Sequence, residues 1–423
     1  MEYSPRIVDE ELDELFLDLP ALALDGAKAV GKTTTALQRV ESIVNLDSKA
    51  TRVPIEADPS QVLRLKRPVL IDEWQRVPEV WDVIRHSVDR DSSGRQFLLA
   101  GSASPIVGAP EHSGAGRIGR LRMRPMTLSE RGLEHPTVSL RELLIGHQVG
   151  LEGTSRLRLG EYVEQITSSG FPAIRELSGR ANRFQLDSYL RNVVDKDVPE
   201  QGVSVRRPEA MMAWLRAYAS ATSSTASYSQ ILDAATPGQG EKPARSTALA
   251  YREVLSSLWL LDPVPAWSAS GNVMTRLGQA PKHHLADPAL AVRLLGLSVN
   301  SLLDGEGLPL DPRTGSLLGA LFESLVTLCV RVPAQVAEAE VAHLRTRNGD
   351  HEVDLIVARP DGKVLAIEVK LSATIGDRDV RHLHWLREQI GNRLLDAIVI
   401  NTGPYAYRRE DGIGVVPLGL LAP

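Results

Sequence analysis

A loop suited to binding phosphate lies near the amino terminus, where residues 26–33 read Gly-Ala-Lys-Ala-Val-Gly-Lys-Thr and fit the pattern G-x-x-x-x-G-K-[ST]. Its glycines let the backbone turn tightly and aim N–H groups at phosphate oxygens, and a helix starting there adds a partial positive charge. We expect Lys32 to reach the β- and γ-phosphates of a nucleotide and Thr33 to hold Mg²⁺. The residues expected to bind the nucleotide are Gly26, Ala29, Val30, Gly31, Lys32, Thr33 and Thr34.

Two adjacent carboxylates, Asp72 and Glu73, end the apolar run at 69–71. Neighbouring side chains at the end of a strand point to opposite faces, so one acid can serve the metal and the other the water. We expect Asp72 to complete the Mg²⁺ site and Glu73 to polarise the attacking water. The alternative interpretation is a pair of solvated acids at the end of a strand.

Three further side chains are candidates for the same site. Ser102 follows another apolar run and is a candidate contact for the γ-phosphate or the attacking water, unless it is an ordinary turn serine. Arg117 or Arg120 is a candidate arginine finger, which stabilises negative charge in the transition state of phosphoryl transfer. The alternative for both arginines is a solvated surface position.

Charged and apolar residues alternate in two segments near the carboxyl terminus, at 351–357 and 366–371. Alternation with period two predicts strands that each have one polar face. Pro-Asp-Gly at 360–362 suits a three-residue hairpin loop that ends in a left-handed glycine. The two segments are therefore predicted to pair as a β-hairpin.

The length of that loop fixes which charged residues face each other. If Arg359 pairs with Lys363, Asp354 faces Glu368 and Glu352 faces Lys370. Directly opposed residues share a face, so four charged groups gather on one side of the hairpin. A two-residue loop would shift the pairing by one and separate them.

Opposed carboxylates repel each other unless a cation offsets their charge. We expect Asp354 and Glu368 to hold Mg²⁺ or Mn²⁺, and Lys370 to orient or deprotonate a water that attacks a phosphodiester. The pattern resembles the D…E-x-K motif of PD-(D/E)XK nucleases. In some of those families a glutamate from the first helix completes the metal site, and Glu323 matches that position.

Two alternatives to a nuclease site stay open. The hairpin could be held by an ordinary salt bridge between Glu352 and Lys370, with Asp354 solvated. The domain could also be a nuclease fold that is kept for binding without catalysis.

The elements that must position these residues follow from hydrophobic patterning. Short continuous apolar runs alternate with helical stretches and predict a parallel sheet covered on both faces; the runs lie at 19–25, 42–47, 68–71 and 96–100. Three helices and a strand pair predict a winged helix, the alternative being a helical linker domain; they lie at 208–220, 227–235, 244–260, 261–267 and 282–286. Arg245, on the third of these helices, is a candidate phosphate contact unless the helix packs in an oligomer. A linker is predicted at 304–314.

The order of motifs along the chain resembles one large family. After the loop come Asp-Glu-Trp-Gln, Gly-Ser-Ala-Ser, Gly-Arg-Ile and Pro-Met-Thr-Leu-Ser-Glu, at 72–75, 101–104, 116–118 and 125–130. This order is similar to that of uncharacterised bacterial and archaeal AAA-type ATPases with a C-terminal domain of unknown function. The family often has basic residues inside the loop, where Ala-Lys-Ala stands at 27–29.

The resemblance covers nearly the whole chain and implies a multidomain α/β protein. The domains it implies are an AAA-type P-loop core, a helical lid, a winged helix and a domain similar to PD-(D/E)XK nucleases, at 1–136, 137–205, 206–303 and 315–423.

Composition removes several classes of protein. With 48 basic and 53 acidic side chains the 423-residue chain has a net charge of −5, so it is not a protein that coats nucleic acid by bulk charge. Its single cysteine, Cys329, excludes an internal disulfide. We find no apolar stretch long enough to span a membrane and no signal peptide, and expect a cytoplasmic protein without a membrane partner.

These observations lead to one main functional hypothesis and one rival. The main hypothesis is an ATPase that uses ATP and Mg²⁺ and acts on DNA or another nucleic acid, with metal-dependent cleavage as a further activity, Mn²⁺ being an alternative ion there. The rival is a nucleotide-dependent switch whose C-terminal domain only binds a partner. A homo-oligomer is compatible with either.

Overall fold

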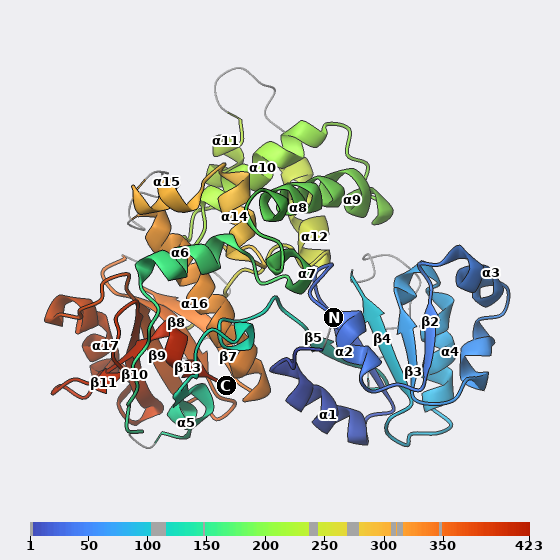
Figure 1. Ribbon diagram of the computed structural model, residues 1–423, viewed down its shortest axis with the longest axis horizontal. Helices are drawn as coiled ribbons and strands as arrows, with labels where there is room; N and C mark the ends of the chain where they lie inside the picture. Colours follow the sequence, from blue (N-terminus) through green and yellow to red (C-terminus); the bar gives the residue numbers. More distant parts are fainter. Residues whose placement is uncertain are drawn as a thin grey trace. The chain divides into compact units, whose positions relative to one another are not determined.

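The chain folds into two compact units (Figure 1). Unit 1 comprises Met1–Arg124, Glu200–Val203 and Glu253–Leu260, and unit 2 comprises Pro125–Pro199, Ser204–Arg252 and Leu261–Pro423. The computed structural model describes residues 3–102, 116–146, 149–236, 244–268, 279–305, 310, 316–346 and 349–423.

Unit 1 contains a five-stranded parallel sheet in the order β2-β3-β4-β1-β5. Its strands are β1 Ala21–Asp25, β2 Ser42–Asn45, β3 Val69–Asp72, β4 Phe97–Gly101 and β5 Gly119–Arg122. The four apolar runs of the sequence are β1 to β4, which confirms the predicted parallel sheet. Because the strands are parallel, their carboxyl ends meet at one edge, where polar side chains from different strands come together.

Helices surround this sheet and account for its apolar strands. They are α1 Val8–Asp18, α2 Lys32–Leu37, α3 Lys49–Ala57 and α4 Glu79–Val88. Alternate side chains of β3, such as Val69 and Ile71, pack in one core cluster with Trp81 and Ile84 of α4. Leu70 between them points to the other face and is equally buried, as expected for a sheet covered on both faces.

Unit 2 combines a helical part with a second sheet. Its helices are α5 Leu140–Ile145, α6 Leu159–Thr167, α7 Pro172–Arg175, α8 Gly179–Asn192, α9 Val198–Glu200, α10 Pro208–Ser220, α11 Tyr228–Ala234, α12 Arg245–Ser257, α14 Pro288–Leu294, α15 Val299–Leu303, α16 Leu317–Val336 and α17 Asp377–Ile390. The ends of α9 and α12 belong to unit 1. The three helices predicted for a winged helix are confirmed as α10, α11 and α12.

Among the residues that the structure describes, the strand pair predicted beside those helices takes the form of two isolated antiparallel bridges, Leu261 with Leu285 and Val264 with Lys282. The glycine-rich break predicted at 237–240, most of the linker predicted at 304–314, and Ala103 and Ser104 lie outside the described residues. The boundary between units falls after Arg124 rather than at 136, and the segments predicted as three later domains lie mostly within unit 2. The helical-lid and winged-helix assignments stay predictions.

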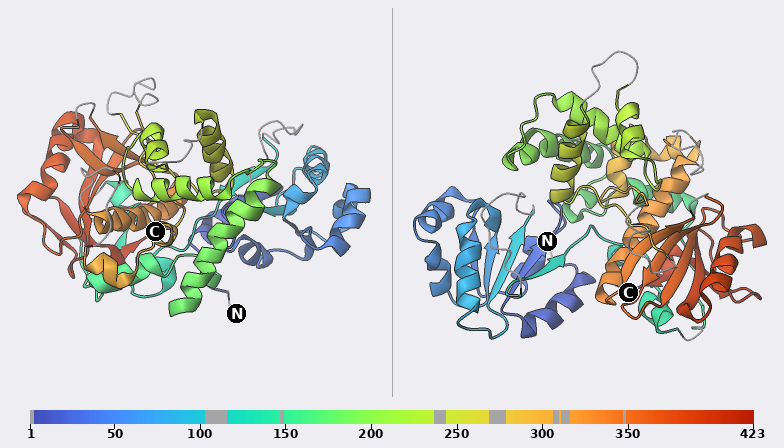
Figure 2. Two further views of the ribbon diagram at one scale, coloured as in Figure 1. Left: turned by 90° about the horizontal axis from the view of Figure 1, so that it is seen from above. Right: turned by 180° about the vertical axis from the view of Figure 1, so that it is seen from behind.

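The second sheet has the order β11-β12-β10-β9-β8-β7 and is drawn in orange and red in Figures 1 and 2. Its strands are β7 Glu340–Arg345, β8 Glu352–Ala358, β9 Val364–Val369, β10 Leu394–Asn401, β11 Tyr407–Arg408 and β12 Gly414–Pro417. The short strands β6 Val138–Ser139 and β13 Leu421–Ala422 pair separately. Helix α17 joins β9 to the parallel strand β10 and covers one face with Val380, Leu383 and Leu386.

The hairpin β8–β9 has the predicted register. Leu355 pairs with Ile367, and Ala358 pairs with Val364. The loop is closed by a hydrogen bond of 2.9 Å from the N–H of Arg359 to the carbonyl of Lys363. This pairing sets Asp354 across from Glu368, as the three-residue loop predicted.

Helix α16 is long and apolar enough to cross a membrane by length and composition, a feature that the sequence analysis did not anticipate. Most of its most apolar window, 78%, is buried inside the structure, and it contacts β7, β8 and β9. Burial of this kind is typical of a core helix of a folded domain.

The hairpin loop yields a stability prediction. Gly362 has a φ of 79°, which side-chain-bearing residues rarely adopt, so Gly362→Ala should lower the free energy of unfolding by about 1 kcal/mol. Gly160→Ala in α6, where an added methyl group meets open space, is the control and should cause no loss. Urea unfolding of both variants checks this, and equal stability of the two would contradict it.

Candidate functional site

The phosphate-binding loop connects β1 to α2 at the carboxyl edge of the unit 1 sheet. A side chain at Gly26 would place its Cβ 2.2 Å from the carbonyl oxygen of Met123, so only glycine fits at the start of the loop. Ala29 and Val30 lie in the loop, Gly31 caps α2, and Thr34 lies in its first turn. The sequence motif therefore stands between a strand and a helix, as predicted.

Lys32 is buried inside this loop, with 6% of its surface exposed. Its Nζ donates hydrogen bonds of 2.7 and 2.9 Å to the carbonyl oxygens of Gly26 and Ala27. Burial lowers the pKa of Lys32 to about 8, although the nearby carboxylates of Glu73 and Asp25 oppose this shift. The cation thus lies where phosphate oxygens are expected to bind.

Thr33 and Asp72 are brought together across the sheet edge. The Thr33 hydroxyl donates a 2.8 Å hydrogen bond to Asp72 Oδ1. Burial raises the pKa of Asp72 above its usual value, against the effect of that hydrogen bond. A hydroxyl and a carboxylate are oxygen ligands of the kind that Mg²⁺ prefers, so this pair fits the predicted metal.

Glu73 begins the turn after β3 with a left-handed backbone, φ 53° and ψ 45°. Its Oε2 accepts hydrogen bonds from the amide of Gln75 and, at 3.1 Å, from the hydroxyl of Ser102. Strand β4 lies between β1 and β3, which is why Ser102 at its end reaches Glu73. The sequence analysis named Ser102 as a candidate but not Gln75, although Gln75 ends the Asp-Glu-Trp-Gln motif that contains Glu73.

The two candidate arginines are held by acids. Arg120 Nε lies 2.7 Å from Oδ2 of the buried Asp25, and Arg117 Nε lies 2.7 Å from Oδ1 of Asp89. Strand β5 runs parallel to β1, with Gly119 beside the start of β1 and Arg122 beside its end. Arg117 therefore precedes β5 at the edge opposite the loop, and the structure does not bring it to the loop of its own chain.

The amino-terminal segment supports the loop in a way that no motif revealed. The guanidinium of the buried Arg6 donates 2.8 Å hydrogen bonds to the carbonyl oxygens of Val30 in the loop and Arg124 after β5. One side chain thereby ties the loop to the end of a neighbouring strand. The sequence carries no local signal for this contact because 118 residues separate Arg6 from Arg124.

The charged residues predicted near the carboxyl terminus also come together, around a cation that the sequence analysis missed. Lys282 Nζ lies 2.9 Å from Glu323 Oε1, 3.0 Å from Glu352 Oε1 and 2.9 Å from Asp354 Oδ1. Lys282 is 1% exposed. We call Lys282, Glu323, Glu352, Asp354, Glu368 and Lys370 the carboxylate cluster.

The other half of the cluster lies on β9 and just after it. Lys370 Nζ lies 2.7 Å from Glu368 Oε2 and 4.0 Å from Asp354 Oδ2. Asp354 Oδ2 also accepts a 2.9 Å hydrogen bond from the backbone N–H of Val369. The structure thus unites Glu323, Asp354, Glu368 and Lys370, as predicted.

Burial and charge set the ionisation of the cluster. Burial opposes ionisation of Asp354, but the charges of Lys282 and Lys370 outweigh it and hold the pKa of Asp354 below its usual value. Burial raises the pKa of Glu323 to about 8 and, together with the Asp354 charge, raises that of Glu368. The two ammonium groups therefore hold Asp354 in its charged form, whereas burial favours the neutral forms of Glu323 and Glu368.

The fit of a metal to this cluster is poor. Within the described ranges, no group of three His, Cys, Asp or Glu residues is arranged to hold a metal ion. The Nζ of Lys282 takes the position between Glu323 and Asp354, two of the three predicted ligands. In the structure these residues form an ion-pair network with Lys282, and the Mg²⁺ or Mn²⁺ site stays a prediction.

The pKa of Lys32 gives a pH prediction. The negative charge of a bound polyphosphate favours the ammonium form, so above pH 8 binding of ADP must take up a proton and should weaken by about tenfold per pH unit. Fluorescence titration with ADP between neutral and alkaline pH measures this, with Lys32→Arg as a control whose charge does not titrate there. A dissociation constant that stays level across this range would contradict it.

Comparisons with known proteins agree with the nucleotide site. Residues 18–131 match an AAA domain, residues 159–301 a domain of unknown function (DUF8612) and residues 318–421 another (DUF4143). Uncharacterised proteins of Mycobacterium bovis and Mycobacterium tuberculosis are each 27% identical over 361 residues, 84% of this chain and 71% of theirs. A solved structure of a Thermotoga maritima RuvB mutant is 16% identical and covers 61% of this chain and 88% of its own, with a TM-score of 0.26. The AAA-domain match supports a P-loop ATPase of the AAA type at residues 18–131, with nucleotide binding as the activity of this site.

Proposed function

We propose that unit 1 hydrolyses ATP with Mg²⁺ held by Thr33 and Asp72. The observation that carries this proposal is the 2.8 Å hydrogen bond between these two side chains, beside the buried ammonium of Lys32. When bound, Mg²⁺ supplies positive charge to the phosphate oxygens. Lys32 exchanges its two carbonyl partners for phosphate oxygens, and the loop N–H groups line the phosphates.

Glu73 is the residue we propose to activate water. Its carboxylate is held by Gln75 and Ser102, and its charge and position suit accepting a proton from the attacking water. Ser102 is then a positioning residue that acts through Glu73. The contact also connects β4 to the acid pair, because Ser102 directly follows that strand.

This assignment gives a kinetic prediction. Glu73→Gln keeps the shape of the side chain but removes the base, so kcat for ATP hydrolysis should fall by about 100-fold or more while ATP binding changes little. A phosphate-release assay and a nucleotide titration check the two halves, with Glu56→Gln on the surface of α3 as the matched control. Hydrolysis retained at near the parental rate would rule out Glu73 as the base.

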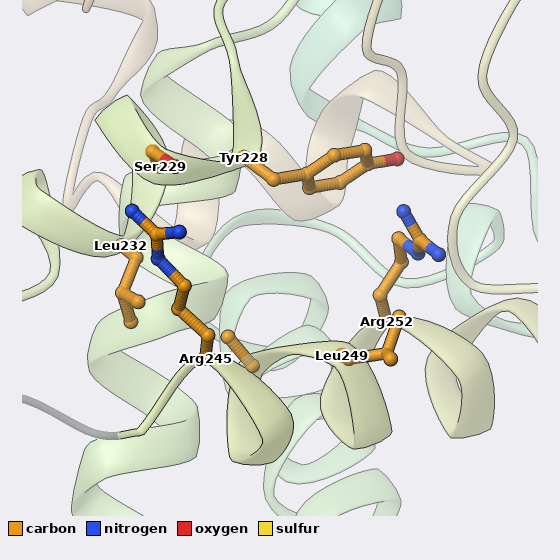
Figure 3. Close-up of a pocket in the computed structure, with 7 residues that line it drawn as sticks. Tyr228, Ser229, Leu232, Arg245, Leu249 and Arg252 are labelled. Atoms are coloured by element: carbon orange, nitrogen blue, oxygen red, sulfur yellow. The ribbon is translucent and has the colours of Figure 1, made fainter.

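Nucleic acid is the partner we propose for unit 2, on the evidence of a pocket between α11 and α12. The pocket has a volume of about 170 Å³ and is lined by Tyr228, Ser229, Leu232, Arg245, Ala248, Leu249 and Arg252. Figure 3 shows Arg245 and Arg252 rising from α12 toward α11. The Arg252 guanidinium lies 4.7 Å from the centre of the Tyr228 ring, which holds it in place.

This surface suits a phosphate backbone. Arg245 and Arg252 lie seven positions apart on α12 and so share one face, with the 44% exposed Leu249 between them. Two guanidinium groups on one face of a helix favour phosphate oxygens. A local pair of this kind is compatible with the net charge of −5, which argues only against bulk electrostatic binding.

A salt titration tests the surface. Arg245→Ala should weaken binding of fluorescent DNA and reduce the slope of log affinity against log salt by about 1, because one phosphate contact is lost. Arg183→Ala, an exposed position on α8, is the matched control. Anisotropy titrations at several salt concentrations give the slopes, and an unchanged slope for Arg245→Ala would refute this contact.

For the function of unit 2, the contacts of Lys282 favour binding over cleavage, since metal-dependent cleavage needs the cation position that this lysine takes. The rival to an ATPase acting on nucleic acid is a nucleotide switch that binds another partner. DNA-stimulated hydrolysis supports the first, whereas retention of nucleotide with slow turnover and no effect of DNA supports the second.

Arg117 belongs to a proposal about assembly. Because it lies at the sheet edge opposite its own loop, it can serve as an arginine finger only for the nucleotide of another copy of the chain. This role requires a homo-oligomer, in which a second copy of the chain is the partner.

A further inference from the structure

We infer that Lys282 is a built-in cation that takes the metal position of the carboxylate cluster, so that unit 2 carries an ammonium where the sequence pattern predicts a divalent ion. The inference concerns only unit 2 and does not depend on ATP hydrolysis. It rests on the contacts of Lys282, on the oxygen atoms left for a metal, and on the backbone that delivers the lysine.

The first observation is that each N–H donor of the Lys282 ammonium has a carboxylate oxygen as a partner. An ammonium has three N–H donors, and Lys282 Nζ has three carboxylate oxygens within 3.0 Å. The oxygens come from α16 and β8, and two of the three residues, Glu323 and Asp354, are predicted metal ligands. A metal cannot use these oxygens in the same geometry while the lysine is in place.

The second observation is the shortage of free oxygens at the hairpin. Asp354 uses Oδ1 for Lys282 and Oδ2 for the N–H of Val369. Glu368 uses Oε2 for Lys370, which leaves only its buried Oε1 without a hydrogen-bond partner among the described residues. Of the four carboxylate oxygens of Asp354 and Glu368, three therefore already have a partner in the structure, whereas Mg²⁺ prefers near-octahedral coordination by several oxygens.

The third observation is that the fold fixes the lysine from both sides. The backbone N–H and carbonyl of Lys282 both pair with Val264, at 2.9 Å each. The backbone of the next residue, His283, also makes two hydrogen bonds. Its carbonyl accepts from the N–H of Ser223 at 2.8 Å, and its N–H donates to the carbonyl of Ser224 at 3.0 Å. Lys282 is thus held by a backbone ladder and is not a surface side chain that folds in by chance.

Charge explains why the cluster keeps this arrangement. Buried carboxylates without a cation repel one another and lose hydration, so the cluster requires positive charge whether or not a metal is available. Lys282 provides one charge and Lys370 a second, 2.7 Å from Glu368. The same side chains therefore join α16, the hairpin and the 282 segment within unit 2.

Mn²⁺ binding tests the inference in the whole chain. The parent carries Asp72→Asn, so that bound Mn²⁺ does not report the nucleotide site. The test variant adds Lys282→Met with Glu352→Gln, which removes one charge of each sign and spares Glu323, Asp354 and Glu368. The matched control adds Lys66→Met with Glu41→Gln, an exposed ion pair in unit 1 with a separation of 3.0 Å.

Equilibrium dialysis against Mn²⁺ without nucleotide should show no binding to the parent or the control up to millimolar ion. The test variant should bind one Mn²⁺, at least about 100-fold more tightly than the parent, because a buried like charge is gone. Circular dichroism establishes that each variant is folded. A folded test variant that binds no Mn²⁺ would overturn the inference.

The parent decides the question even if the test variant fails to fold. Stoichiometric Mn²⁺ binding to the parent that is lost when Asp354→Asn is added would place a metal in the cluster beside Lys282 and overturn the inference. Absence of such binding supports it.

Discussion

Each unit contains a buried lysine whose ammonium group requires oxygen partners, and these partners come from segments that the fold must bring together. A cation removed from water is stable only when hydrogen bonds or opposite charges replace its hydration. Lys32 has two neutral carbonyl partners, and Lys282 has three carboxylates. The neutral partners of Lys32 can be exchanged for phosphate oxygens at small electrostatic cost. Removing Lys282 from its three acidic partners would instead leave a buried ammonium without the groups that replace its hydration. The first lysine is thus suited to a ligand that comes and goes, and the second to a permanent junction.

The features that the sequence predicted correctly are local ones. The loop motif, the apolar runs of β1 to β4 and the helices α10 to α12 each lie within a few residues of their signals. The hairpin register was also predictable, because the Pro-Asp-Gly loop fixes which residues of the strand before it pair with residues of the strand after it. Placement of Asp354 across from Glu368 required no knowledge of the rest of the chain.

The features that could not be predicted join distant segments. Lys282 lies 41 residues from Glu323 and 72 from Asp354, and it precedes two histidines, which are more conspicuous than a single lysine as candidate site residues. Arg6 reaches the loop from a segment with no motif. Composition also does not show which segments of different local character fold into the same compact unit, and the segments predicted as three later domains lie mostly in unit 2. The apolar character of α16 fits its burial inside the structure.

The pairing of β6 with β13 has a consequence for synthesis. It brings Val138 beside Leu421, whereas the sheet of unit 1 is complete with β5 at Arg122. A chain that emerges from the ribosome amino end first can therefore assemble the nucleotide-binding sheet while most of unit 2 is still being translated. In unit 2, β6 can pair only after β13 has been synthesised, almost 300 residues later. Contacts between residues so far apart in the sequence form slowly. During this interval the apolar segments of unit 2 lack their partners, a condition that favours aggregation.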